Sequence, residues 1–141
     1  MHLDYHGFMS EIPTGARRTC EHLVTSELAI DFLGPEEARV LATPSLVALF
    51  EMCCRNLLRE FLPAGQDSVG AHIELRHLAP TPLGMRVRLQ VEVTGVEGRR
   101  VQFRLEAMDE REKVAEGTHE RFIVDVARFT QRVRQKLAQS G

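Results

Sequence analysis

Residues 42–63 read ATPSLVALFEMCCRNLLREFLP, and they carry the strongest structural signal in the sequence. Its apolar residues recur at three- and four-residue spacing, which predicts an amphipathic helix about four turns long. Thr43 can serve as the N-cap, and Pro44 can occupy the first helical position, where its missing N–H is not needed. Pro63-Ala64-Gly65 predicts the end of the helix. The apolar stripe consists of Leu46, Leu49, Phe50, Cys53, Cys54, Leu57, Leu58 and Phe61.

After the helix the apolar period changes to two residues, which predicts a series of half-buried strands. The first of them begins with an apolar face made of Val69, Ala71, Ile73 and Leu75. Three further strands are expected, with short turns between the four. These strands span 87–93, 101–107 and roughly 114–126, and the turns lie at 80–84, 95–98 and 109–113.

Two weaker patterns flank this region. Residues 22–30 alternate weakly and predict a first strand before the helix. Phe129, Val133 and Leu137 predict a short basic C-terminal helix at about 128–138. We therefore expect a single domain over residues 1–141, with its core at about 20–127.

The order of the predicted elements indicates the fold class. A strand, a long helix with one apolar face and a four-strand meander require the helix to lie on one curved sheet. Short turns favour antiparallel neighbours, because parallel strands need long crossover connections. This α+β arrangement, a curved antiparallel sheet wrapped around one long central helix, is that of the hot-dog fold. Other α+β folds share the same order of elements.

Composition argues against several classes of function. The formal net charge is −2 with both signs interleaved, so no basic field for nucleic-acid binding is expected. No apolar run is long enough to span a membrane, and the N-terminus does not resemble a secretory signal. The three cysteines, Cys20, Cys53 and Cys54, cannot all pair within one chain. A reducing, cytoplasmic location is therefore expected.

Three polar side chains are candidates for chemistry, although each has an ordinary structural explanation. His77 continues the apolar face of the first downstream strand, so its ring should point towards the helix. It is either a working titratable group or a core-edge histidine satisfied by one hydrogen bond. Glu51 lies at the edge of the helical stripe, where it can instead form an exposed pair with Arg55. Thr43 can be a plain N-cap.

Other candidates are weaker. His2 and His6 are four residues apart, but no further ligands follow at the spacing of a metal site, so no metal is expected. The sequence has no Gly-rich phosphate loop, no G-x-S-x-G elbow and no C-x-x-C motif. Two groups of basic residues are either solvated surface or contacts for the phosphates of a nucleotide. These groups are Arg99 with Arg100, and Arg132, Arg134 and Lys136.

Several motifs together resemble a known family. They are Ala42-Thr43, Glu51, Val69-Gly70-Ala71, His77, Thr81-Pro82-Leu83-Gly84, Val96-Glu97-Gly98-Arg99-Arg100, Gly117-Thr118-His119-Glu120-Arg121 and Val133-Arg134-Gln135-Lys136. This set, spread from about Val40 to Lys136, resembles the fluoroacetyl-CoA thioesterase-like family of the hot-dog superfamily. The resemblance implies that Thr43, Glu51 and His77 form the catalytic set.

The resemblance also implies supporting residues and shows two departures. Gly70 matches the glycine whose backbone N–H lies near the thioester carbonyl, and Arg121 looks like a supporting, substrate-binding residue. Gly34 and Glu37 stand where the family's fluoroacetate specialist has gating phenylalanines, which argues against fluoroacetyl-CoA as the substrate. Pro44 replaces a small residue and removes one backbone N–H from the helix start.

The expected activity is hydrolysis of a small acyl-CoA, or a related acyl thioester, with no cofactor beyond the coenzyme A of the substrate. In it His77 takes a proton from Thr43 or a water, and Glu51 acts as base or attacking carboxylate. The rivals are a non-catalytic acyl-CoA-binding module and a hot-dog hydratase or dehydratase. Thr43 and Glu51 are eight residues apart, which is about 12 Å along a helix. A homodimer with antiparallel central helices, possibly paired into a tetramer, would bring them to one substrate.

Overall fold

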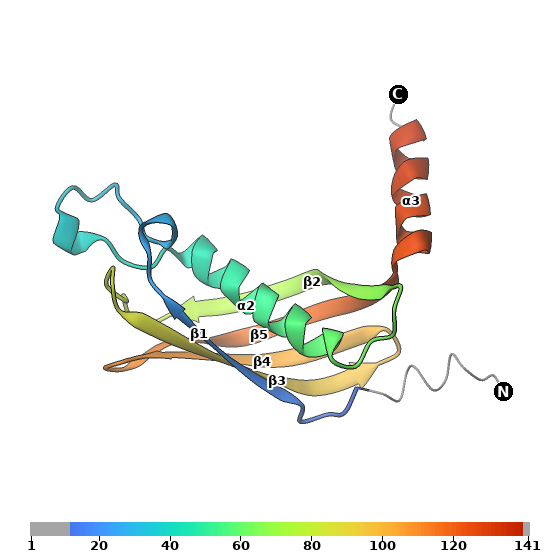
Figure 1. Ribbon diagram of the computed structural model, residues 1–141, viewed down its shortest axis with the longest axis horizontal. Coiled ribbons are helices and arrows are strands. Elements are labelled where there is room, and N and C mark those ends of the chain that lie inside the picture. The colour runs from blue at the N-terminus through green and yellow to red at the C-terminus, as the bar shows by residue number, and fades with distance from the viewer. Residues whose placement is uncertain (1–11, 140–141) are drawn as a thin grey trace.

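The computed structural model describes residues 12–139, and it shows one antiparallel sheet with a helix across one face (Figure 1). The predicted α+β arrangement of a sheet around a central helix is confirmed. The sheet strands are β1 Arg17–Leu23, β2 Gln66–His77, β3 Arg86–Glu97, β4 Arg100–Asp109 and β5 Lys113–Asp125. The helices are α2 Thr43–Arg59 and α3 Val126–Gln139, with short 3-10 turns η1 Ser26–Leu28 and η2 Glu36–Ala38.

The core lies between α2 and the inner face of the sheet. Six residues of the predicted stripe are buried on α2, and alternate residues of β3 and β4 meet them. Each large apolar side chain buried in this way contributes roughly 1.5–3 kcal/mol to folding. The buried helical residues are Leu46, Phe50, Cys53, Cys54, Leu57 and Leu58, and those of the strands include Val87, Leu89, Val91, Phe103 and Leu105.

The order of the strands corrects the predicted meander. Strands β3, β4 and β5 are hairpin neighbours as expected, but β2 pairs with β5 at the far edge, giving the order β1-β3-β4-β5-β2. The turn at 80–84 is therefore not a hairpin. Its backbone bonds to the segment that precedes α2, from Leu41 N–H to the Thr81 carbonyl, and to Val24, so the chain crosses the end of the sheet.

A β-bulge in β2 changes which residues face the helix. Val69 pairs with Phe122 and Gly70 with Arg121, whereas Ala71 has no partner and His72 pairs with Glu120. Paired residues share a face, and the side chain of Arg121 is buried towards α2. Gly70 therefore faces α2 and Val69 does not, so the predicted inner face is wrong for Val69 and exposed Ala71. It is confirmed for Ile73, Leu75 and His77, which follow the bulge.

Two predictions before the helix also need correction. The first strand is Arg17–Leu23 rather than 22–30, because the chain leaves the sheet at Val24 and turns through η1. The N-cap of α2 is Ala42, with no side-chain capping bond, so Thr43 is the first helical residue. The Thr43 hydroxyl is thus free for another partner.

The C-terminal helix is longer than predicted and stands away from the sheet (Figure 1). None of its residues is buried, and its apolar stripe of Val126, Phe129, Val133 and Leu137 is exposed. Between residues 12 and 139, no helix is long and apolar enough to cross a membrane.

Candidate functional site

The first half of the site joins the start of α2 to the end of β2. The Thr43 hydroxyl lies 2.7 Å from His77 Nδ1 in a hydrogen bond whose direction depends on the histidine tautomer. His77 Nε2 is buried and has no hydrogen-bond partner within residues 12–139. Burial lowers the pKa of His77 below its ordinary value, so the ring is neutral at neutral pH. A neutral imidazole beside a hydroxyl can accept the proton that a nucleophile must lose.

A small apolar pocket adjoins this pair. It has a volume of about 340 Å³, and Thr43 and His77 form part of its wall. Phe32 and Leu78, which are 77% and 51% exposed, lie on the same wall. Large apolar side chains this exposed beside a titratable pair are typical of a site that receives an apolar ligand.

The second half of the site lies farther along α2, over the bulge in β2. The Glu51 carboxylate rests on Gly70, so closely that a Cβ at position 70 would collide with Glu51 Oε2. Glu51 Oε2 also lies 3.8 Å from Arg121 Nη1. The glutamate side chain is 43% exposed, whereas that of Arg121 is 6% exposed. The glycine at position 70 lets the carboxylate approach the strand this closely, and the nearby Arg121 guanidinium stabilises the negative charge of Glu51.

Arg121 is held by a buried polar network that the sequence analysis missed. Its Nε donates to Ser68 Oγ at 2.7 Å and its Nη2 to the Ser68 carbonyl at 2.9 Å. His119 Nδ1 donates to the His72 carbonyl at 2.7 Å, which leaves Nε2 to accept from Arg121 Nη1 at 3.2 Å. Burial, the largest cause, lowers the pKa of His119. The sequence signal for this network was that His119 and Arg121 lie at every second position of β5, on the same face as the apolar Ile123.

The two halves do not meet within one chain. Thr43 with His77 lies at the start of α2, and Glu51 with Gly70 and Arg121 lies two helical turns later, about 12 Å along the axis. All five residues predicted for the site are therefore on the helix side of the sheet, but they form two clusters. Neither cluster includes a contact between Thr43 and Glu51.

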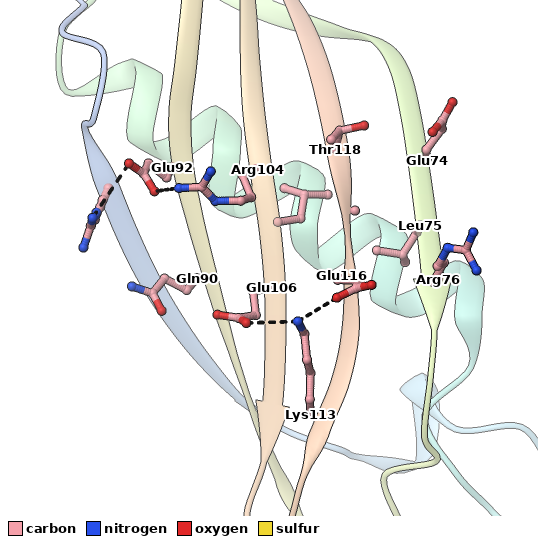
Figure 2. Close-up of a pocket in the computed structure, with 13 residues that line it drawn as sticks. Glu74, Leu75, Arg76, Gln90, Glu92, Arg104, Glu106, Lys113, Glu116 and Thr118 are labelled. Carbon is pink, nitrogen blue, oxygen red and sulfur yellow. Dashed lines mark hydrogen bonds and ion pairs between the residues drawn. The ribbon is translucent and has the colours of Figure 1, made fainter.

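A second concavity, larger than the pocket beside Thr43 and His77, lies on the opposite face of the sheet (Figure 2). It measures about 870 Å³ and spreads across the strands, with α2 behind them. Its acidic and basic side chains neutralise one another: Glu92 pairs with Arg104, and Lys113 bridges Glu106 at 3.3 Å and Glu116 at 2.6 Å. Exposed ion pairs of this kind are typical of solvated surface, so this face is a weaker candidate site.

No group of three or more His, Cys, Asp or Glu side chains is arranged to hold a metal ion between residues 12 and 139. His2 and His6, the pair considered in the sequence analysis, lie outside the described residues.

The site and the fold have clear relatives. A family model described as fluoroacetyl-CoA-specific thioesterase matches residues 24–127. The fluoroacetyl-CoA thioesterase of Streptantibioticus cattleyicolor is 34% identical over 128 residues, covering 86% of this chain and 92% of the relative. A solved structure of the fluoroacetyl-CoA thioesterase FlK superposes with a TM-score of 0.80 at 34% identity, covering 89% of this chain and 97% of the other.

Two bacterial structures are similar as well. A thioesterase superfamily member from Thermus thermophilus has a TM-score of 0.83 at 32% identity, covering 92% of this chain and 96% of its own. A hot-dog-like protein from Thermanaerovibrio acidaminovorans has a TM-score of 0.82 at 29% identity, covering 95% and 97%. The predicted hot-dog fold is thereby confirmed. The chain belongs to the fluoroacetyl-CoA thioesterase family of the hot-dog thioesterase superfamily.

Proposed function

We propose that this protein hydrolyses a small acyl-CoA, or a related acyl thioester, to the free acid and the thiol. The observation that carries the proposal is the Thr43–His77 hydrogen bond of 2.7 Å on the wall of an apolar pocket, with His77 Nε2 buried and unpartnered. A buried ring nitrogen without a partner costs folding free energy, which is repaid when a substrate or a water binds to it.

Thioester hydrolysis needs a nucleophile, a proton acceptor and a donor for the oxyanion. His77 accepts the proton of the Thr43 hydroxyl or of a water. Glu51 supplies a carboxylate, which acts either as a base for water or as the attacking group. The Gly70 N–H stabilises the oxyanion. The acyl carbon–sulfur bond breaks, the sulfur leaves with a proton as the thiol, and the oxygen and remaining proton of water end in the acid.

The two clusters act together across a homodimer. Thr43 and Glu51 are about 12 Å apart along one helix, too far for both to reach one acyl carbon. Antiparallel packing of two α2 helices would place Glu51 of one subunit near Thr43 of the other and give two equivalent sites. In the single chain the Glu51 side chain is 43% exposed. A group that completes the site of a partner subunit must be accessible in this way.

The acyl group is small. The pocket of about 340 Å³ is lined by Ile30, Val40 and Ala79 as well as Phe32 and Leu78, with no charged side chain apart from His77 when it is protonated. The related thioesterase has been solved as one variant with fluoroacetate and coenzyme A, and as another variant with acetyl-CoA. This chain carries Gly34 and Glu37 where the fluoroacetate specialist has gating phenylalanines, so we expect short acyl-CoAs to be hydrolysed without a preference for fluoroacetyl-CoA.

A thiol-release assay on a panel of acyl-CoAs of increasing chain length tests the activity. Hydrolysis yields free thiol, a hydratase yields a hydrated acyl-CoA, and a binding module leaves the ligand unchanged. His77→Ala should abolish release, and His72→Ala, on the same strand but with a half-exposed ring, is the matched control. Thiol release by neither the wild type nor any variant, across the whole panel, would refute the proposal.

Subunit mixing tests the shared site. Thr43→Ala and Glu51→Ala dimers should each keep no more than about a hundredth of wild-type activity, but a mixed dimer contains one site with both defects and one with neither. Random exchange makes about half of the dimers mixed, so activity should return to roughly a quarter of wild type. A mixture of Thr43→Ala with His77→Ala is the control and should stay inactive, because those two groups belong to the same chain. No recovery in the first mixture, with exchange confirmed, would place Thr43 and Glu51 in one chain.

A further inference from the structure

Two thiols meet where β1 crosses α2. Cys20 on β1 and Cys53 on α2 are 33 residues apart in sequence, and their Sγ atoms are 2.6 Å apart. Both are free cysteines. The sulfurs of a disulfide are separated by about 2.05 Å, so bond formation requires the two atoms to approach by only about half an ångström.

The two cysteines differ in their access to solvent. Cys53 is 1% exposed, and burial raises the pKa of its thiol. Cys20 is only partly buried, and Arg18 lies two residues before it on the same face of β1. A cation beside a partly exposed thiol is the environment typical of oxidisable cysteines.

The neighbouring cysteine provides an internal comparison. Cys54 follows Cys53 on the same helix and is also buried, and burial raises the pKa of its thiol too. Within residues 12–139, however, its sulfur makes no contact like that between Cys20 and Cys53. Any pairing by proximity therefore selects Cys53 over Cys54.

We propose that Cys20 and Cys53 form a redox pair that closes to a disulfide on exposure to a peroxide. The reachable Cys20 sulfur attacks the peroxide, the O–O bond breaks, and a sulfenic acid and one water are produced. The Cys53 sulfur then attacks the sulfenic sulfur, loses its proton and displaces a second water. Two thiols and one hydrogen peroxide thus give one disulfide and two waters, with two electrons passed to the peroxide.

The bond would tie an edge strand to the central helix. β1 pairs with β3 alone, and the disulfide would add a covalent link from β1 to the middle of α2. Closing a loop of this length restricts the unfolded chain and should raise the Tm by about 10 °C. Because the sulfurs move so little, Glu51, two residues before Cys53, should stay in place.

The experiment treats the full chain with hydrogen peroxide and measures its intact mass, its thiols titrated with N-ethylmaleimide in denaturant, and its Tm. We expect a loss of two hydrogens, a fall from three thiols to one, and a rise in Tm that dithiothreitol reverses. Cys20→Ser and Cys53→Ser should prevent all three changes, whereas Cys54→Ser should close as readily as the wild type and leave no thiol.

Three results would overturn the inference. The first is stepwise addition of oxygen atoms to Cys20 with no disulfide formed. The second is a disulfide that forms only between two chains. The third is a disulfide whose formation requires Cys54. Mass and melting temperature do not depend on turnover, so this test can fail while the thioesterase proposal holds, and the reverse is equally possible.

Discussion

Replacing Gly70 with alanine should move the Glu51 carboxylate without unfolding the protein. The new Cβ would collide with Glu51 Oε2, and it would lie 3.5 Å from His119 Cε1 and 3.6 Å from Arg121 Nη1, which are ordinary contacts. To reach ordinary contact distance as well, the carboxylate oxygen must move by about 1 Å, and a misplacement of this size costs about a hundredfold in rate.

The same substitution should have little effect on stability. Gly70 has no positive φ angle, so alanine is tolerated by the backbone and gains about 0.4–1 kcal/mol from a less flexible unfolded chain. Displacing a half-exposed glutamate from its rotamer costs about 0.5–1.5 kcal/mol, which offsets the gain. The Tm should therefore change by no more than a few degrees.

The assay is kcat for thiol release, measured in a double-mutant cycle with Glu51→Ala. Gly70→Ala should lower kcat about a hundredfold in the wild type but have almost no further effect when Glu51 is alanine, because nothing is left to displace. Gly95→Ala, where a Cβ would lie 3.2 Å from Gln102 Oε1 on β4, is the matched control away from the site. Near-normal kcat in Gly70→Ala, or an equal loss in both backgrounds, would refute this role for the Gly70–Glu51 contact.

Three further predictions concern the same elements. Thr43→Ala and His77→Ala should each lower thiol release at least about a hundredfold with unchanged far-UV circular dichroism, and near-normal turnover in both would remove them from the site. kcat/KM should rise with pH, because only neutral His77 accepts a proton. The midpoint should lie below the ordinary histidine pKa of 6.5, because burial lowers the pKa of His77. A flat profile from about pH 4 to 8 would contradict this role. Asp67 has its pKa lowered to about 2, mainly by its hydrogen bond to Arg55, so it stabilises the fold above about pH 4, and that contribution is lost as the pH falls towards 2. Denaturant unfolding should therefore show a shallower pH dependence in Asp67→Asn over that window, and identical slopes would be evidence against the pair.

Local pattern was enough to predict the central helix and the direction of His77. The stripe on α2 depends only on helical spacing. After the bulge, His77 follows Ile73 and Leu75 at every second position, so all three face the helix. The close contact of the Glu51 carboxylate with Gly70 was not predicted, because it depends on how closely α2 approaches β2.

Non-local contacts account for most of what was missed. The position of β2 beside β5 is a pairing between distant segments, which periodicity does not report. The burial of His119 depends on two partners supplied by β2 and β5, the His72 carbonyl and Arg121. The meeting of Cys20 with Cys53 is likewise a tertiary contact, and the sequence analysis treated Cys53 as an ordinary core residue.

The bulge at Ala71 makes the length of β2 matter as much as its composition. Gly70 and His77 are seven residues apart, and in a regular strand two residues an odd number apart point to opposite faces. The one unpaired residue between them shifts the alternation, so both clusters of the site open on the same side of the sheet. Removing Ala71 would turn one of the two away from α2. Natural variants of this strand should therefore tolerate substitutions of its outward residues far better than any single-residue insertion or deletion.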